Sequence, residues 1–368
     1  MTQSRVALIT DGRHPETDDA AARRRAVLQN HPSDVELLEY TMSAEHLSSD
    51  GRRALWGLRT RLIEDDVAAI HVLAPGLAAI AARWLSTGLR RPLIASYRGS
   101  AAAHGCLSLV MRRYERWFYK GCSRVVVASE LLSDEAVRQQ WTTADHLVVV
   151  RAGVQADVFS SDKRSSELRC AWRVSDSRPA ILFVGTTASR CELELVAHIR
   201  RILEDHRRLH RFLICAPPSQ REAWQGAIPD AAFIDDRQEA RLATSFASSD
   251  VFLSASDTSD PDPGIRMLMA QASGLPVLVP NTGAHRESMV HATTGFLCRP
   301  GSEHDFASRA SELLSNAPRR LAMGVSAATY AKTRPWASTL ESLFEAYRDA
   351  AHRTAAPREL TAIGPRAA

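Results

Sequence analysis

The sequence lacks the features of a disulfide-bonded protein, a zinc protein or a membrane-spanning protein. Its six cysteines form no C-x-x-C motif and no pair of spacings that would frame a zinc site. No segment approaches the ~18 consecutive apolar residues of a membrane-spanning helix. We therefore expect buried or idle thiols in a reducing cytoplasm, and a protein that is soluble or peripheral at the inner face of a membrane.

Concentrated positive charge is also missing. The net charge is +4, but the basic residues are spread along the chain rather than gathered in one stretch. A nucleic-acid-binding domain more often gathers them on one element or one face. The composition therefore argues against nucleic acid as a partner.

Length and hydrophobic pattern indicate two α/β domains. A chain of 368 residues exceeds the size at which a single core keeps growing. Short apolar runs alternate with amphipathic stretches, which is typical of a parallel sheet covered by helices on both faces. The runs expected to be strands are 6–9, 35–40, 68–72, 92–95, 124–127 and 146–150, and then 180–184, 211–215, 231–234, 251–253, 277–279 and 295–297.

A hydrophilic connector at 160–177 separates the two series of strands. We predict two doubly wound, Rossmann-like domains, the first over residues 1–160 and the second over 161–335. The helical segment at 336–353 is expected to pack back on the first domain, because no strand follows it, and 354–368 to form a loose tail. Such sheets bind ligands outside the carboxyl ends of their strands, so a site is expected in a central cleft between the domains.

The most informative segment follows the strand expected at 251–253. A loop rich in Asp, Pro and Ser ends at Gly264, a helix of about three turns follows, and a Gly-Leu-Pro step leads into the next strand. The start of such a helix can hold a diphosphate, because its amides donate hydrogen bonds and its dipole favours anions.

This segment resembles the sugar-nucleotide motif of family-four glycosyltransferases, which have the GT-B fold of two Rossmann-like domains facing a cleft. Five residues fall in register with that motif, namely Ala270, Ala272, Gly274, Pro276 and Val277. Residues 183–185, 247–253, 283–287 and 294–297 are also similar to the family, and 151–159 resemble bacterial enzymes that use GDP-mannose. The resemblance thus spans nearly all of the second domain and part of the first.

Five side chains differ from those that the family uses. Where the resemblance implies a histidine, an arginine, a lysine and two glutamates, this sequence has Arg98, Thr186, Cys191, Pro261 and Met269. The glycine-containing loop after the first strand is absent too, since 15–20 contain no glycine. Losing one group that stabilises the leaving diphosphate typically costs about 3 kcal/mol in the transition state.

Other groups could bind the donor in their place. The amides of Gly264 and Ile265 and the side chain of Arg266 belong to the first helical turn and are expected to hold the diphosphate. Candidates from the loop after the first strand of the second domain are Gly185, Thr186 and Arg190. The alternative for Arg266 is a solvated residue on the surface of an ordinary helix.

Candidate residues for the sugar and the reaction lie in other loops. Asp260 and Asp262 could hydrogen-bond sugar hydroxyls, with Asp262 as a catalytic candidate, or they could bond local amides in a turn. Arg98 and His104 are catalytic candidates from the first domain, although His104 could be a solvated or capping residue. Glu287 matches an acidic position of the family and is a donor-binding candidate; its alternative is charge complementarity at a helix N-terminus.

A basic and aromatic stretch lies on a helix expected in the first domain. It contains Arg112, Arg113, Trp117, Phe118, Tyr119 and Lys120. Such a helix suits a lipid–water interface. The alternative is that it packs its aromatic residues on the sheet and keeps its charges in solvent.

The resemblance implies a retaining glycosyltransferase that moves a hexose from a nucleotide diphosphate sugar, GDP-mannose-like or a UDP-sugar, to a lipid or glycan acceptor. The sugar nucleotide is a co-substrate, and no metal or other cofactor is expected. A first alternative is a non-catalytic GT-B protein, a pseudo-glycosyltransferase that binds a partner, a glycan or a nucleotide. A second is an enzyme whose pocket serves a different donor.

Overall fold

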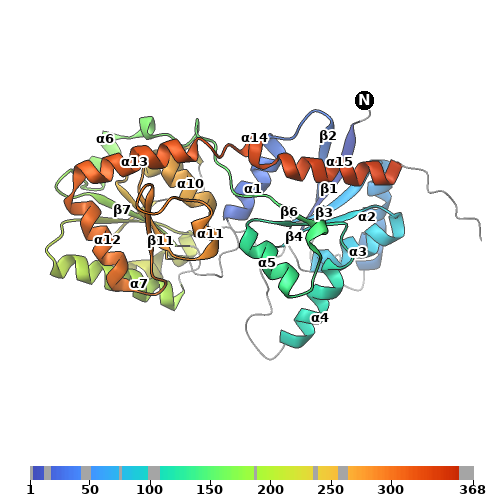
Figure 1. Ribbon diagram of the computed structural model, residues 1–368, viewed down its shortest axis with the longest axis horizontal. Helices are drawn as coiled ribbons and strands as arrows, with labels where there is room; N and C mark the ends of the chain where they lie inside the picture. The colour runs from blue at the N-terminus through green and yellow to red at the C-terminus, as the bar shows by residue number, and fades with distance from the viewer. Residues whose placement is uncertain are drawn as a thin grey trace, which may run out of the picture.

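The computed structural model describes residues 3–11, 18–42, 51–73, 77–97, 108–185, 189–234, 239–255 and 264–355. Within these ranges the chain forms two parallel six-stranded sheets, each flanked by helices (Figure 1). The twelve strands lie where the hydrophobic pattern predicts them, so the expected α/β class with two doubly wound sheets is confirmed.

The first sheet has the strand order β2-β1-β3-β4-β5-β6. Its centre is apolar on both faces, because Val6, Ala7, Leu8 and Ile9 of β1 are fully buried. The strands are β1 (Ser4–Asp11), β2 (Val35–Met42), β3 (Ala69–Val72), β4 (Leu93–Tyr97), β5 (Arg124–Val127) and β6 (Leu147–Val149). The helices between them are α1 (Asp18–Gln29), α2 (Gly51–Glu64), α3 (Leu77–Leu89), α4 (Ser108–Tyr119) and α5 (Glu130–Arg138).

The second sheet has the order β12-β11-β10-β7-β8-β9. Its strands are β7 (Ala180–Val184), β8 (Arg211–Cys215), β9 (Ala232–Ile234), β10 (Val251–Leu253), β11 (Val277–Pro280) and β12 (Gly295–Cys298). Its helices are α6 (Ser166–Ala171), α7 (Arg190–Asp205), α8 (Arg221–Ala227), α9 (Glu239–Ala247), α10 (Gly264–Ala272), α11 (Gly283–Arg286), α12 (Glu303–Ser315) and α13 (Ala317–Ala331).

Local sequence explains how individual helices begin. The Ser189 hydroxyl accepts a hydrogen bond from the amide of Glu192, and the Glu192 carboxylate accepts one from the amide of Ser189, so α7 starts with a capping box. Val196, Ile199 and Leu203 then repeat at helical spacing and are fully buried against the second sheet.

The chain crosses between the two sheets twice, and the crossing segments run side by side. Val154 and Pro335 form a parallel bridge, and the Val154 amide donates to the carbonyl of Arg334 at 2.9 Å. After the second crossing, the short α14 (Trp336–Thr339) lies at the junction of the domains, and α15 (Glu341–Ala355) lies on the first sheet, where it contacts β1, β2, β3 and β6 (Figure 1). One apolar cluster extends from the first sheet through Val154 and Phe159 to the helices of the second.

In the part of the chain that the structure describes, none of the helices has both the length and the apolar composition needed to cross a membrane. Across those same ranges, no group of three His, Cys, Asp or Glu side chains is arranged to hold a metal ion.

Candidate active site between the two domains

Helix α10 begins at the junction of the two domains. A methyl group at Gly264 would come within 3.0 Å of both the Ala152 Cβ of the first crossing segment and the Ser288 Oγ, so only glycine fits without a shift. The first amides of a helix have no partner within the helix, and they carry a partial positive charge. Gly264 therefore brings an anion-binding element close to the first domain.

Arg266 lies in the first turn of this helix and is 7% exposed. The alternative of a solvated surface arginine is therefore wrong. A guanidinium is costly to bury without anionic or hydrogen-bonding groups around it. Ile265 is fully buried, so it can contribute its amide to a ligand but not an exposed side chain.

Met269, at the position of a family glutamate, faces helix α1 of the first domain. It lines a small cavity of about 280 Å³ between the domains, together with Ala22, Ala26, Gln29 and Trp336. The thioether is 7% exposed. Charged side chains, Arg25 and Glu239, also line this space, but the thioether itself gives nothing to bind ribose hydroxyls.

The loop after β7 is described only at its two ends. The Gly185 amide donates to the carbonyl of Cys215 at 3.0 Å, which fixes the end of the strand. Arg190, the first residue of α7, has a side chain that is 89% exposed and pairs with Glu194 of its own helix at 2.7 Å. The structure thus gives Arg190 a partner on its own helix rather than at the start of α10.

Glu287 follows α11, and its carboxylate reaches across to the other domain. It accepts hydrogen bonds from the amides of Glu130 at 3.0 Å and Leu131 at 3.2 Å, the first two residues of α5. The alternative drawn from the sequence, that Glu287 begins its own helix, is wrong, because Glu287 is the C-cap of α11. The helix whose N-terminus its carboxylate caps belongs to the first domain, which local sequence could not show.

Five predicted site residues lie outside the described ranges. They are Arg98, His104, Thr186, Asp260 and Asp262. Their assignment to donor binding or catalysis therefore remains a prediction.

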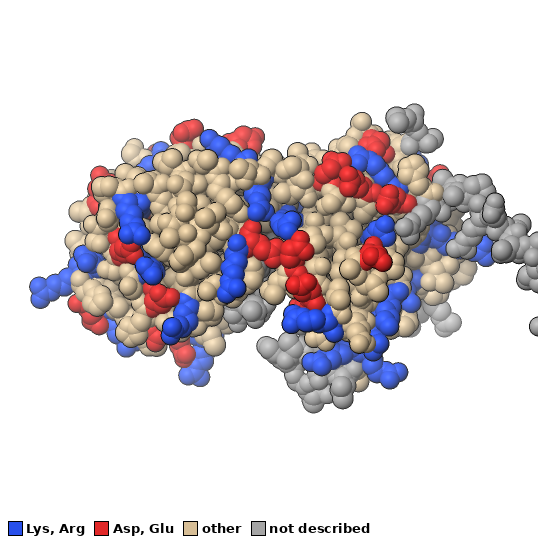
Figure 2. Space-filling view, in the orientation of Figure 1, with Lys and Arg blue, Asp and Glu red and all other residues tan. Residues whose placement is uncertain are grey.

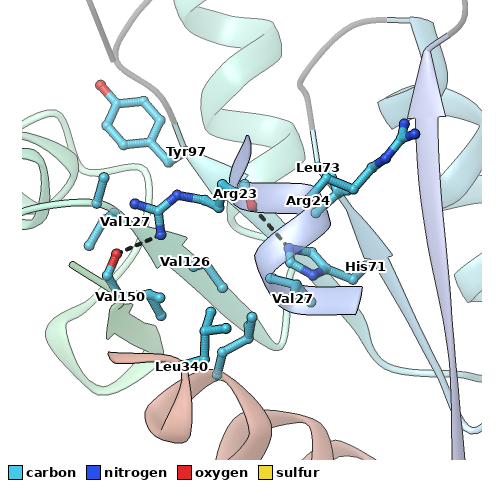
Figure 3. A pocket seen from close by; sticks show the side chains of 13 residues that line it. Arg23, Arg24, Val27, His71, Leu73, Tyr97, Val126, Val127, Val150 and Leu340 are labelled. Carbon is cyan, nitrogen blue, oxygen red and sulfur yellow. Dashed lines mark hydrogen bonds between the residues drawn. The ribbon is translucent and has the colours of Figure 1, made fainter. Parts of the chain in front are cut away.

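A cavity lies in the first domain, between α1 and the carboxyl halves of β3 to β6 (Figure 3). Its free space amounts to about 540 Å³, part of which is open to solvent. Arg23 enters it from α1 and donates to the carbonyl of Val150 at 2.8 Å. Arg24 extends toward β2 instead and pairs with Glu39 at 3.1 Å.

His71 forms part of the cavity wall. It is not among the site residues that the sequence predicts. Its Nδ1 is 2.6 Å from the hydroxyl of Tyr347 and its Nε2 is 3.0 Å from the hydroxyl of Ser96. Burial raises the pKa of the Tyr347 phenol above its ordinary value, which keeps it protonated. A histidine inside an otherwise apolar strand was the available signal, since a buried polar side chain needs partners.

Helix α4 divides its aromatic residues between core and surface. Phe118 and Tyr119 are buried, whereas Trp117 is 48% exposed and lies under the guanidinium of Arg83 at 4.3 Å. Arg112, Arg113 and Lys120 are exposed. Lys and Arg side chains gather over α4 on the face shown in Figure 2.

Comparison with known proteins gives matches to both domains. The model described as Glycosyltransferase Family 4 matches residues 5–158, and the one described as Glycosyl transferases group 1 matches residues 178–316. A GDP-mannose-dependent alpha-mannosyltransferase of Corynebacterium glutamicum is 26% identical over 76% of this chain and 67% of its own length. A sulfoquinovosyl transferase of Arabidopsis thaliana is 25% identical over 73% of this chain and 54% of its own length.

Relatives of other specificity match at the same level. A D-inositol 3-phosphate glycosyltransferase of Corynebacterium kroppenstedtii is 26% identical over 64% of this chain and 55% of its own length. The chain thus spans between 54% and 67% of these three curated relatives.

Solved structures agree in fold over almost the whole chain. A glycosyltransferase from Rickettsia africae has a TM-score of 0.75 at 14% identity, covering 95% of this chain and 99% of that one. HepE of Anabaena, in complex with UDP and glucose, has the same TM-score and identity, covering 94% of this chain and 100% of that one. Both domains match, in order, the two halves of one enzyme family: the chain belongs to the family 4, or group 1, glycosyltransferases and has their GT-B fold.

Proposed function

We propose that the protein is a retaining glycosyltransferase that transfers a hexose from a nucleotide diphosphate sugar to a lipid or glycan acceptor. The observation that carries the proposal is the start of α10, where Gly264 lies against the first domain and the buried Arg266 occupies the first turn. Helix amides and a guanidinium are the donors that a leaving diphosphate needs.

The proposed reaction requires few side chains. The bond between the sugar anomeric carbon and the phosphate oxygen breaks, and a bond from the same carbon to an acceptor oxygen forms on the same face. The acceptor proton passes to the leaving phosphate, so no protein nucleophile is needed. Groups that bind the diphosphate more strongly as its negative charge grows accelerate the transfer, which is the role proposed for Arg266 and the α10 amides.

A guanosine nucleotide and mannose are the first donor to examine. One relative carries GDP-mannose in its name, whereas the structural neighbour from Anabaena holds UDP and glucose. Binding of GDP, UDP and ADP, measured by calorimetry and by thermal shift, separates these donors. A nucleotide present at 100 times its dissociation constant stabilises the folded state by about 2.7 kcal/mol.

The matched variants are Arg266→Ala and Arg201→Ala. Arg201 is an exposed arginine of α7, so its loss should leave nucleotide binding unchanged. Loss of binding in Arg266→Ala alone supports the diphosphate site at α10. Absence of binding for every nucleotide in the wild type would refute the transferase proposal.

A non-catalytic GT-B protein is the second candidate, and two residues favour it. Met269 fills the place of a ribose-binding glutamate and packs against α1, and the Glu287 carboxylate is engaged with α5. If no nucleotide binds, we infer that the protein is a pseudo-glycosyltransferase, whose two domains are held together by the contacts of Met269 and Glu287. If only a nucleotide other than GDP or UDP binds, the protein is an enzyme for a different donor.

We also propose that the acceptor is reached at a membrane surface on the cytoplasmic side. Three partly exposed tryptophans support this: Trp117 of α4, Trp56 of α2 and Trp84 of α3, with the last two in edge contact at 6.4 Å. The guanidinium of Arg59 lies 5.3 Å from Trp56, as that of Arg83 lies over Trp117. Tryptophan beside arginine suits the boundary between lipid headgroups and acyl chains.

A further inference from the structure

Glu287 connects three parts of the molecule that are far apart in the sequence. While its carboxylate holds the first amides of α5, its backbone carbonyl accepts hydrogen bonds from Arg334 at 3.0 Å and from the hydroxyl of Tyr330 at 3.3 Å. Arg334 immediately precedes the second crossing between the domains, and its carbonyl binds the first crossing at Val154. Glu287 of the second domain is thus bonded both to helix α5 of the first domain and to Arg334, at the segment where the chain crosses between the domains.

Helix α5 receives from Glu287 what a helix usually receives from its own cap. The Ser129 hydroxyl accepts a hydrogen bond from the amide of Leu132 at 3.2 Å, as an N-cap residue does. The two amides before Leu132 turn to Glu287 instead. A negative charge at this end of a helix is favoured by the helix dipole and by the unpaired amides.

Arg151 completes the contact between the domains. It lies in the first crossing segment, 2.6 Å from the carboxylate of Glu130 and 3.6 Å from that of Glu287. Its guanidinium therefore stands between two like charges that would otherwise repel each other. Figure 2 shows acidic and basic side chains gathered on this face where the two domains meet, and α5 and α11 lie side by side there in Figure 1.

The contact is linked to the start of α10 through the next residue in the chain. The Ser288 carbonyl accepts a hydrogen bond from the Gln271 side chain of α10 at 2.9 Å. A methyl group at Gly264 would meet the Ser288 hydroxyl at 3.0 Å. Glu287 is bonded to the first domain and the adjacent Ser288 is bonded to α10. A displacement of α5 relative to the second domain is therefore transmitted to α10.

We propose that Glu287 and Arg151 form an interdomain latch, which holds the start of α10 in register with the acceptor domain. Glu287 is then a positioning residue rather than a ligand of the sugar. The role in transfer rests on the proposed function, but the closure of the two domains does not. An enzyme of this kind needs donor and acceptor oxygens aligned closely, and small displacements cost much of the rate.

Hydrogen exchange and small-angle X-ray scattering on the full chain test the latch. In Glu287→Ala we expect the amides of Glu130 and Leu131 to exchange roughly tenfold faster or more, because each loses a hydrogen bond to a charged group. The Leu132 amide, held by Ser129, should change less. The radius of gyration should rise as the domains separate, and Arg151→Ala should act in the same direction with less than additive effect in the double variant.

Two further variants make the result specific. Glu287→Gln keeps the size of the side chain but removes its charge, so it tests the latch without a cavity if the alanine variant folds poorly. Glu194→Ala removes an ion pair of the same kind within α7 alone and should leave exchange at α5 unchanged. Wild-type exchange at Glu130 and Leu131 and an unchanged radius in both Glu287 variants would overturn the proposal.

Kinetics separate positioning from folding. If the wild type transfers sugar, Glu287→Gln should lower kcat by roughly tenfold while the nucleotide dissociation constant stays within about twofold, because the donor domain itself is intact. A rise in that dissociation constant with kcat unchanged would show Glu287 to be a donor ligand instead. If the wild type binds no nucleotide, the proposed function fails, while the exchange and scattering results still decide the latch.

Discussion

His71 of β3 and Tyr347 of α15 share a hydrogen bond of 2.6 Å across 276 residues of sequence. Both side chains are buried, and the pair ties the last described helix to the centre of the first sheet. Helix α15 is thus held to the first domain by a specific polar contact as well as by apolar packing.

Removing this hydroxyl should weaken the fold. We expect Tyr347→Phe to lower the free energy of unfolding by about 1–3 kcal/mol, because the buried imidazole loses a partner that water cannot replace. Urea denaturation measures the change. Ser326→Ala, which removes an exposed hydroxyl bonded within α13, is the control and should cost less than about 0.5 kcal/mol. Equal stability of Tyr347→Phe and the wild type would show that the contact contributes nothing.

Asp250 lies in the segment 247–253 that is similar to the family, and the structure shows what its carboxylate binds. Its carboxylate is 6% exposed and accepts hydrogen bonds from Arg164 at 2.8 Å, Arg169 at 2.9 Å and the amide of Ala180 at 2.8 Å. Asp250→Ala removes the acceptor of the buried Ala180 amide and the negative charge beside the 11% exposed Arg169, and should cost about 3 kcal/mol in denaturant unfolding.

The control for this prediction is Asp176, a second carboxylate that pairs with Arg169. Asp176 is fully exposed and 3.9 Å from Arg169, so Asp176→Ala should change stability by less than about 0.5 kcal/mol. If the two substitutions cost the same, burial of Asp250 would not be the source of its contribution.

Substitutions of Met269 test whether this chain still accommodates the glutamate that the family has at position 269. Met269→Glu places a carboxylate at a buried position beside Ala22, Ala26 and Trp336, with Arg25 and Glu239 also lining the space, and should lower the free energy of unfolding by about 1 kcal/mol or more at pH 7. Met269→Leu conserves volume and should cost less than about 1.5 kcal/mol. A glutamate tolerated without loss, as judged by thermal unfolding, would mean that the domains separate readily enough to solvate it.

His285 should make stability depend on pH. It is fully buried beside Thr282, and desolvation lowers its pKa to about 4. Between an unfolded value near 6.5 and this folded value, only the unfolded chain takes up the proton, so stability falls as pH falls. The expected loss is about 2 kcal/mol between pH 7 and pH 5.

Unfolding of wild type and His285→Asn at several pH values measures this contribution. The variant should lose much of the slope, although His210, whose pKa burial also lowers, will keep part of it. Identical slopes in the two proteins would contradict the prediction.

The surface of the first domain formed by Trp56, Trp84 and Trp117 predicts binding to anionic lipid. Sedimentation with phosphatidylglycerol vesicles should bring down the wild type, whereas vesicles of phosphatidylcholine should not. Arg113→Gln should weaken binding roughly fivefold, since a basic residue near an anionic surface contributes about 1 kcal/mol, and Trp117→Ala should weaken it further. Leu321→Ala, which removes an even more exposed apolar side chain of the second domain, is the control. Binding that does not distinguish the two lipids would remove the charge argument.

Much of the architecture could be predicted because it is written in local pattern. Each of the twelve strands is a short apolar run, and the register of residues 270–277 with a family motif is a property of neighbouring positions. The start of α10 at Gly264 could be predicted for the same reason, since turn residues precede it and helical spacing follows.

The partners of single side chains could not be predicted in this way. Whether Arg266 is solvated or buried and what Met269 faces depend on elements contributed by other parts of the chain. The sequence by itself determined two α/β domains, since apolar periodicity fixes which face of each element is buried. Only the tertiary structure decided that the Glu287 carboxylate holds α5 of the opposite domain. The hydrogen bonds depend on distances in space, and the residues that form them are 157 and 156 positions apart in the sequence.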